Sequence, residues 1–170
     1  MDQERKPIYI LSMTVNSTQP INYGTFGESA RPSPRPTILA VDDNPPELAL
    51  MTYLLHEQGY QVLNSISGLE ALRIVEEYQP DLILMDVEMP LMGGVEACQK
   101  LKENPELSDI PVILIIPAAV IELRQQAFSS GAADYIPKPF FPEEVIARVK
   151  THLTLQQLRH RLQQLKPSKV

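Results

Sequence analysis

Three short, continuous apolar runs constrain the fold of this chain more than any other feature of its sequence. They are the segments TILAVD (37–42), DLILMD (81–86) and IPVILII (110–116). A strand with one face in water alternates apolar and polar residues, whereas a strand buried on both faces is apolar throughout. Strands buried on both faces are typical of parallel sheets that helices cover on either side. The runs therefore predict a parallel sheet at the centre of the fold.

The segments between these runs have helical patterns, and proline and glycine mark their ends. Proline stands where two helices should begin, and glycine follows where two should end, as at Gly59 and Gly131. We expect weaker strands at 60–65 and 133–136, and helices at 45–58, 67–78, 92–103, 118–130 and from Pro142 onwards. Five strands that alternate with five helices predict a doubly wound α/β fold, a three-layer sandwich whose last helix is extended.

The chain divides into three parts by composition. Residues 1–36 are rich in Ser, Thr, Asn, Gly and Pro and end in RPSPRP, which is typical of a flexible tail and an extended linker. An alternative for part of this tail is a strand from Ile8 to Val15. We expect the α/β domain at 37–152 and a helical extension at 153–170.

Composition excludes several classes of function. The net charge of −6 and the pI near 5.1, with no basic stripe, argue against a nucleic-acid-binding surface. No apolar segment is long enough to span a membrane. The single cysteine, Cys98, cannot form an internal disulfide, which fits the reducing cytoplasm, and its apolar surroundings predict packing rather than reactivity.

Acidic residues follow two of the apolar runs. Asp42 and Asp43 end the first run and Asp86 ends the third predicted strand. Ligands of such folds bind at the carboxyl ends of the strands, so these carboxylates should share one small cleft. Their mutual repulsion would be relieved by a hard divalent cation such as Mg²⁺. The alternative is that Asp43 only caps the helix near Pro45.

A lysine follows the last predicted strand in the segment PKPF. Lys138 stands between two prolines at the same edge of the sheet as the acids. A lysine is usually a solvated charge, but one held in this way at the rim of an acidic cleft is better suited to an electrostatic clamp. No glycine fingerprint follows the first strand and no Gly-Lys-Ser/Thr occurs, so nucleotide binding is disfavoured.

These segments resemble the signatures of a known family. ILAVDDN, LILMDVEMPLMGG and GAADYIPKPF are similar, in order and spacing, to the response regulator receiver domain of two-component signalling, over residues 37–152. The resemblance implies a flavodoxin-like, chemotaxis-regulator-like fold. It also implies a cytoplasmic phosphoacceptor signalling domain rather than an enzyme, capable at most of self-phosphotransfer and slow autodephosphorylation. Its partner would be a histidine kinase or a phosphotransfer protein.

The resemblance also implies roles for individual residues. Asp86 matches the aspartate that accepts a phosphoryl group, and Lys138 matches the lysine that pairs with it and then with the phosphoryl oxygens. The peptide bond that follows Lys138 would be cis. Tyr135 matches the aromatic side chain whose rotamer reports phosphorylation. The Mg²⁺ ligands would be Asp42, Asp43, Asp86 and the backbone carbonyl of Glu88. The turn after the phosphoacceptor would comprise Met89, Pro90 and Gly94.

One position departs from the family pattern. Where the family has Thr or Ser at the end of the fourth strand, this chain has Ile116, and Pro117 follows it without an N–H. Two lost hydrogen bonds to a charged group forfeit about 3–6 kcal/mol. This loss is comparable to the free energy that drives a two-state switch from 1:99 to 99:1, about 5.5 kcal/mol. We therefore expect weakened switching even if the domain still accepts a phosphoryl group. Alternatively, the Ala118 N–H or a water replaces the missing donors. Either way, Pro117 should stiffen the following loop.

The last helical pattern continues well past the expected domain. An apolar stripe at Val145, Val149 and Leu153 should pack on the sheet. A second stripe has the 3-4-3 spacing of a short coiled coil and predicts a homodimer or a contact with an output domain, the alternative being an exposed helix end. It consists of Leu155, Leu158, Leu162 and Leu165. We expect Pro167 to end the helix, and His152 and His160 to be ordinary polar positions.

Three hypotheses for function follow. The leading one is a receiver that accepts a phosphoryl group on Asp86 and relays the signal through its fourth and fifth structural elements and its last helix. The second is a pseudo-receiver, a dimerisation or docking module that does not depend on phosphorylation, which Ile116 and Pro117 favour. The third is a haloacid-dehalogenase-like phosphohydrolase, but the chain lacks the Asp-x-Asp and the cap domain that such an enzyme needs.

Overall fold

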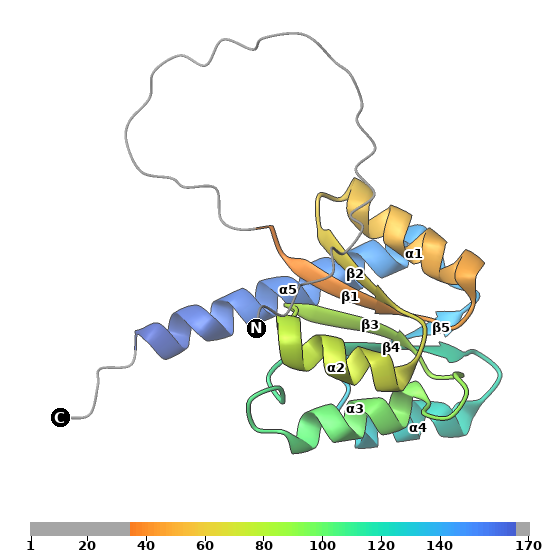
Figure 1. Ribbon diagram of the computed structural model, residues 1–170. Coiled ribbons are helices and arrows are strands. Elements are labelled where there is room, and N and C mark those ends of the chain that lie inside the picture. The colour runs from red at the N-terminus through yellow and green to blue at the C-terminus, as the bar shows by residue number, and fades with distance from the viewer. Residues whose placement is uncertain (1–34, 166–170) are drawn as a thin grey trace, which may run out of the picture. The chain divides into compact units, whose positions relative to one another are not determined.

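Five short strands form one parallel sheet in the order β2-β1-β3-β4-β5, within residues 35–165, which the computed structural model describes. The strands are β1 (Thr37–Val41), β2 (Gln61–Ser65), β3 (Leu82–Asp86), β4 (Val112–Pro117) and β5 (Asp134–Lys138). The helices are α1 (Pro45–Glu57), α2 (Gly68–Tyr78), α3 (Gly94–Glu103), α4 (Ile121–Ser129) and α5 (Pro142–Gln164). The predicted doubly wound α/β fold is confirmed (Figure 1).

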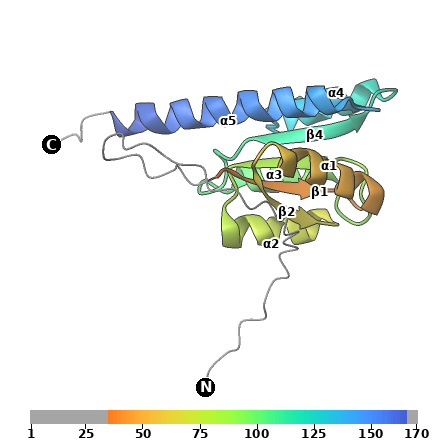
Figure 2. The same ribbon diagram turned by 90° about the horizontal axis from the view of Figure 1, so that it is seen from above.

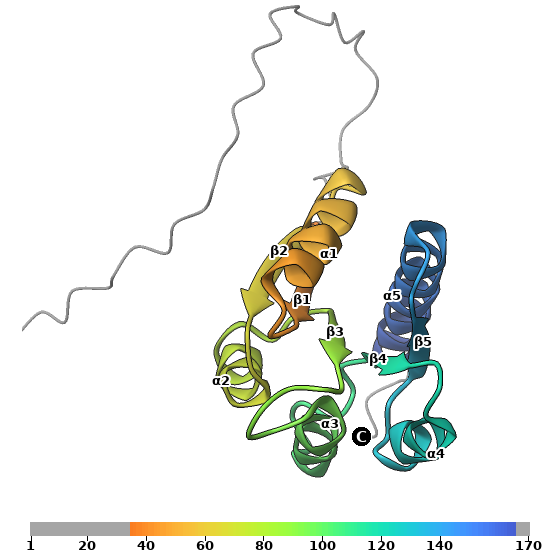
Figure 3. The same ribbon diagram turned by 90° about the vertical axis from the view of Figure 1, so that its right-hand side faces the viewer.

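Helices cover both faces of the sheet, which explains the continuous apolar runs. Figure 3 shows α1 and α5 on one face and α2, α3 and α4 on the other. Successive side chains of β3 alternate between the two sides: Leu82 and Leu84 pack with α1 and α5, whereas Ile83 and Met85 pack with α2 and α3. All four are completely buried. A polar residue at any of them would be desolvated without a partner.

The order of the strands determines where a site can form. The chain moves outward from β1 to β2, then crosses back so that β3 lies beside β1 on its other side. The register pairs Val41 of β1 with Met85 of β3, so the residues just after each strand lie at the same edge. This is the topological switch point, where ligands of doubly wound folds bind.

Two boundaries in the second half differ from the predicted ones. The fourth helix was expected from residue 118 but begins at Ile121, because Pro117 to Val120 form a turn closed by the Val120 N–H to the Pro117 carbonyl at 3.3 Å. β5 was expected to end at 136 but extends to Lys138 through pairing with β4. The prediction began the helix too early because Ala118 and Ala119 are strong helix formers.

The last helix has a buried part and a part that leaves the sheet. Val145, Val149 and Leu153 are buried under it, as predicted. Figure 2 shows α5 continuing past the ends of the strands. The four leucines of the second predicted stripe lie on this part and are exposed: Leu155, Leu158, Leu162 and Leu165. Whether a partner covers them stays a prediction.

His152 is not the ordinary polar position that we expected. Its Nε2 atom lies 3.1 Å from Oδ2 of Asp134 at the start of β5, and its side chain is only 15% exposed. Arg148 contacts the same carboxylate with 2.9 Å hydrogen bonds to both oxygens. The pairing escaped the sequence analysis because it joins residues that are eighteen positions apart on two elements. His160, by contrast, is exposed.

Some predictions fall outside the described residues. The tail at 1–36 lies almost wholly there, with its alternative strand from Ile8 to Val15, and so does the expected helix stop at Pro167. Among residues 35–165, no helix combines the length and the apolar character that crossing a membrane requires.

Candidate functional site

Three carboxylates meet at the switch point of the sheet. Asp42 and Asp43 directly follow β1, and Asp86 is the last residue of β3. Each offers an oxygen, and these oxygens all lie within 4.8 Å of one another. Asp42 and Asp86 are buried, and Asp43 is exposed at the mouth of the cluster. The predicted convergence is therefore present in the structure.

Burial makes the negative charge of this cluster costly. It raises the pKa of Asp42 to about 6, although the Asn44 N–H and the Lys138 ammonium act in the opposite direction. Burial also raises the pKa of Asp86, which Lys138 and the Glu88 N–H partly offset. Buried carboxylates with raised pKa values are stabilised by binding either a proton or a cation.

The carboxylate oxygens of the cluster are suited to binding a hard cation. Oδ1 of Asp42 accepts the Asn44 N–H at 2.8 Å, but its buried Oδ2 has no hydrogen-bond partner among residues 35–165. Asp86 likewise has Oδ2 bound to the Glu88 N–H at 2.9 Å, while Oδ1 is met by the ammonium of Lys138. Buried polar atoms are rarely left without partners, and Mg²⁺ prefers carboxylate oxygens and water. The residues present therefore suit a divalent cation.

Lys138 stands at the centre of the acidic cleft. Its Nζ atom lies 2.8 Å from Oδ1 of Asp86 and 3.7 Å from Oδ2 of Asp42. Burial opposes its charge, but the contacts with Asp86 and Glu47 outweigh this effect and raise its pKa, so the ammonium stays charged. The peptide bond to Pro139 is cis, as the resemblance implied.

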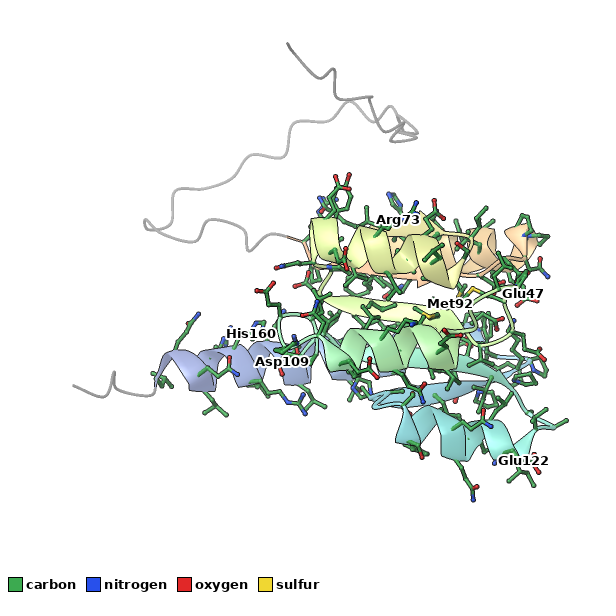
Figure 4. All side chains as sticks on the ribbon, turned by 60° about the horizontal axis from the view of Figure 1, so that its bottom comes forward. Glu47, Arg73, Met92, Asp109, Glu122 and His160 are labelled. Atoms are coloured by element: carbon green, nitrogen blue, oxygen red, sulfur yellow. The ribbon has the colours of Figure 1, made fainter. Side chains whose placement is uncertain are left out.

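Glu47 is a member of the site that the sequence analysis missed. Its Oε2 atom lies 2.5 Å from the Lys138 ammonium, and its Oε1 atom accepts from the Asn44 side chain at 3.2 Å. Figure 4 shows Glu47 at the end of the domain that contains the carboxyl ends of the strands. An acid in the first turn of a helix is common because the helix dipole favours it, so the position of Glu47 did not indicate a role in the cleft.

The turn after Asp86 brings a helix close to the strand end. A Cβ atom on Gly94 would clash with the carbonyl oxygen of Asp86, so only glycine allows α3 to begin here. The Gly94 N–H donates to the Val87 carbonyl at 3.2 Å. Of the other predicted turn residues, Met89 is buried and Pro90 is exposed. The turn thus positions Asp86 rather than contributing a reactive group.

The residue that departs from the family pattern at the end of β4 belongs to the hydrophobic core. Ile116 is completely buried and packs in the layer that α2, α3 and α4 cover. Pro117 is paired with Lys138, and the Ala118 N–H donates to the Lys138 carbonyl at 3.3 Å. The Ala118 N–H would have to leave this partner in order to replace the missing donors, and that alternative stays a prediction.

Tyr135 lies on β5 beside α4. Its half-buried ring packs edge-on against Phe128 at a centroid distance of 5.5 Å, and the Arg124 guanidinium lies 5.8 Å from the ring centre. The ring is therefore held by contacts with α4. Cys98 is buried, as predicted, with its thiol 3.6 Å from the Ser130 carbonyl.

Comparisons with known proteins agree with this geometry. The family model of the response regulator receiver domain matches residues 38–150. The DNA-binding dual master transcriptional regulator RpaA of Synechocystis sp. is 37% identical over 118 residues, which are 69% of this chain and 49% of RpaA. The polar-differentiation response regulator DivK of Brucella ovis is 35% identical over 117 residues, which are 69% of this chain and 95% of DivK. The first relatives are longer: the match spans 26% of a probable cyclic di-GMP phosphodiesterase of Vibrio cholerae and 8% of hybrid signal transduction histidine kinase D of Dictyostelium discoideum.

Solved structures lead to the same conclusion. A putative response regulator from Chloroflexus aurantiacus superposes with a TM-score of 0.69 at 32% identity, covering 71% of this chain and 98% of that one. The receiver domain of sensor histidine kinase PA1611 from Pseudomonas aeruginosa, which has a magnesium ion in its active site cleft, superposes with a TM-score of 0.66 at 28% identity, with the same coverage. The acidic cleft, the strand order and these matches together show that the chain belongs to the response regulator receiver domain family.

Proposed function

We propose that this domain accepts a phosphoryl group on Asp86, with Mg²⁺ held by Asp42, Asp43, Asp86 and the carbonyl of Glu88. The donor would be the phosphohistidine of a histidine kinase or a phosphotransfer protein. The observation that carries the proposal is a cluster of three carboxylates, two of which lie close to the ammonium of Lys138. Oδ2 of Asp42 has no hydrogen-bond partner within residues 35–165. Such a cleft combines a nucleophile with cationic partners for a phosphoryl group.

The proposed transfer uses each residue in a distinct way. A carboxylate oxygen of Asp86 forms a bond to phosphorus while the phosphorus–nitrogen bond breaks, and the imidazole leaves with the bonding electron pair. The Glu88 N–H already holds one Asp86 oxygen and so orients the carboxylate. The ammonium of Lys138 neutralises charge on the transferred oxygens. A bound Mg²⁺ would supply further charge stabilisation of the same kind.

The first prediction concerns the adduct itself. Incubation with Mg²⁺ and acetyl phosphate should add one phosphoryl group to the wild-type protein, detected by intact mass. Asp86→Asn should remain unmodified, because an amide cannot form the acyl phosphate. Two results would refute the proposal. One is an adduct of equal yield on Asp86→Asn, and the other is no adduct on the wild type at saturating Mg²⁺.

A second prediction follows from the contact between Glu47 and Lys138. A phosphoryl group on Asp86 must compete with the Glu47 carboxylate for the same ammonium and is repelled by it. Glu47→Gln removes that charge, so the adduct should form severalfold faster, as quench-flow mass spectrometry would measure. Glu57→Gln, at the exposed end of the same helix, is the matched control and should have no effect. A slower reaction of Glu47→Gln would mean that Glu47 assists the transfer.

The alternative proposal is a pseudo-receiver that docks or dimerises without phosphorylation. The observation that favours it is the end of β4, where Ile116 and Pro117 replace two donors and the Ala118 N–H is already bonded. Without those bonds, about 3–6 kcal/mol of coupling between the phosphoryl group and the β4–α4 loop is lost. Chemistry at Asp86 and signalling through Tyr135 can therefore be separated in this chain.

Restoring the hydroxyl tests that separation. Ile116→Thr should lower the free energy of unfolding by about 1–2 kcal/mol, because apolar burial is lost in a packed core. It should nevertheless increase the NMR response of Tyr135 to beryllofluoride, a mimic of the phosphoryl group. Ile115→Thr is the matched control, since Ile115 is equally buried but faces α1 and α5. If both variants responded like the wild type, the missing hydroxyl would not be the cause of uncoupling.

For the end of α5 we propose pairing with a second copy of the chain. The exposed leucines have coiled-coil spacing, and Leu158 and Leu162 are 49% and 64% exposed. Leu158→Ser with Leu162→Ser should convert a dimer into a monomer in sedimentation equilibrium. Leu69→Ser on α2, also 49% exposed, should leave the mass unchanged. A wild type that is monomeric up to high micromolar concentration would exclude the dimer and leave an output domain as the partner.

A further inference from the structure

We propose that a cavity at the other end of the sheet binds a small anion bearing carboxylate or phosphate groups. The cavity has a volume of about 440 Å³ and opens where α5 leaves the sheet. Its polar lining includes Lys102, Asp109, His152, Gln156 and Arg159. This volume lies in the range of roughly 300–1,000 Å³ that is usual for small-molecule pockets.

The cavity is distinct from the acidic cleft. Its walls come from the end of α3, the turns before β4 and β5, and the second half of α5, and they include Pro111 and Ala133. Pro111 and Ala133 come just before β4 and β5, whereas the acids of the cleft lie at the carboxyl ends of β1 and β3. The cavity and the cleft therefore lie at opposite edges of the sheet. Figure 4 shows Asp109 and Glu47 at opposite ends of the domain. A ligand here would not contact Asp86 or Lys138.

Gln156 points to a polar ligand. Only 7% of the surface of this residue is exposed, and its side chain lines the cavity. The amide reaches the cavity rather than being enclosed in the core, whereas the other buried residues of this helix, Val145, Val149 and Leu153, are apolar. An oxygen-rich ligand in the cavity would accept the N–H groups of this amide.

The charges around Gln156 favour an anion. Arg159 has no ion-pair partner within residues 35–165, although the protein as a whole is acidic. Lys102 donates to the carbonyls of Ser108 and Ile110 at 2.7 and 2.6 Å, which leaves one of its three N–H groups available. Asp109 is the single acid in the lining, so two cations outnumber it.

The wall that His152 forms is rigid. Its Nε2 atom is held 3.1 Å from Asp134, which Arg148 also binds through both oxygens. Lys102 in turn fixes the loop before β4 through its two carbonyl contacts. A pocket whose walls are already ordered loses little conformational entropy when a ligand binds.

The test is an NMR titration of the full chain with pyrophosphate and, separately, with citrate. Chloride keeps the ionic strength constant, and Mg²⁺ is left out because both probes chelate it. Saturable shifts should appear at the Gln156 side-chain amide and at the Gly131 and Ala133 N–H groups. A response to one probe only would distinguish a phosphate ligand from a carboxylate ligand.

Variants link the binding to the cavity. Arg159→Gln should raise the dissociation constant about tenfold, because a charge-assisted hydrogen bond is lost at an exposed position that does not support the fold. Gln156→Leu should abolish the side-chain signal and weaken binding. Arg161→Gln, on the same helix outside the cavity, should bind like the wild type. Equal losses in Arg159→Gln and Arg161→Gln, or shifts that never saturate with either probe, would overturn the site.

Discussion

The repulsion among three carboxylates at the carboxyl ends of β1 and β3 is the constraint on which the rest of this structure depends. Two of the acids are buried, and burial, together with the neighbouring carboxylates, raises their pKa values. The fold offsets this cost with one ammonium, from Lys138, and with two backbone N–H groups. One buried oxygen of Asp42 still has no hydrogen-bond partner among residues 35–165. A cation would stabilise such a cleft, and under the proposed function it would lie beside the carboxylate that accepts the phosphoryl group.

Under the proposed function, chemistry and signalling depend on different parts of this cleft. The groups proposed to stabilise a transferred phosphoryl group lie on β3 and β5 or directly after β1, and the fold brings them close together. The groups that would carry its presence to α4 should come from the end of β4, where Ile116 belongs to the core and the Ala118 N–H is bonded to Lys138. Glu47 adds a competitor for the ammonium. Under the proposed function, we therefore expect the domain to accept a phosphoryl group more readily than it changes conformation in response.

The fold could be predicted from the sequence because local signals and burial agree. Continuous apolar runs, prolines at helix starts and glycines after helix ends all indicate the same alternation of strands and helices. The acids and Lys138 could be placed because parallel strands deliver their ends to one edge. Glu47 and the pairing of His152 with Asp134 could not be predicted. Each joins residues far apart in the chain, and each involves a residue type with a common alternative role on a helix surface. The start of α4 was missed because hydrogen bonds of the backbone, rather than side-chain types, determine that turn.

The separation of chemistry from signalling is tested most directly by amide chemical shifts of the wild-type protein with Mg²⁺, before and after addition of beryllofluoride. The account predicts large changes at Glu88 and Lys138, which border the acidic cleft, and small changes at Tyr135 and Phe128, which lie on the α4 side. Comparable changes at both places would contradict it, because the signal would then reach α4 without the donors that β4 lacks.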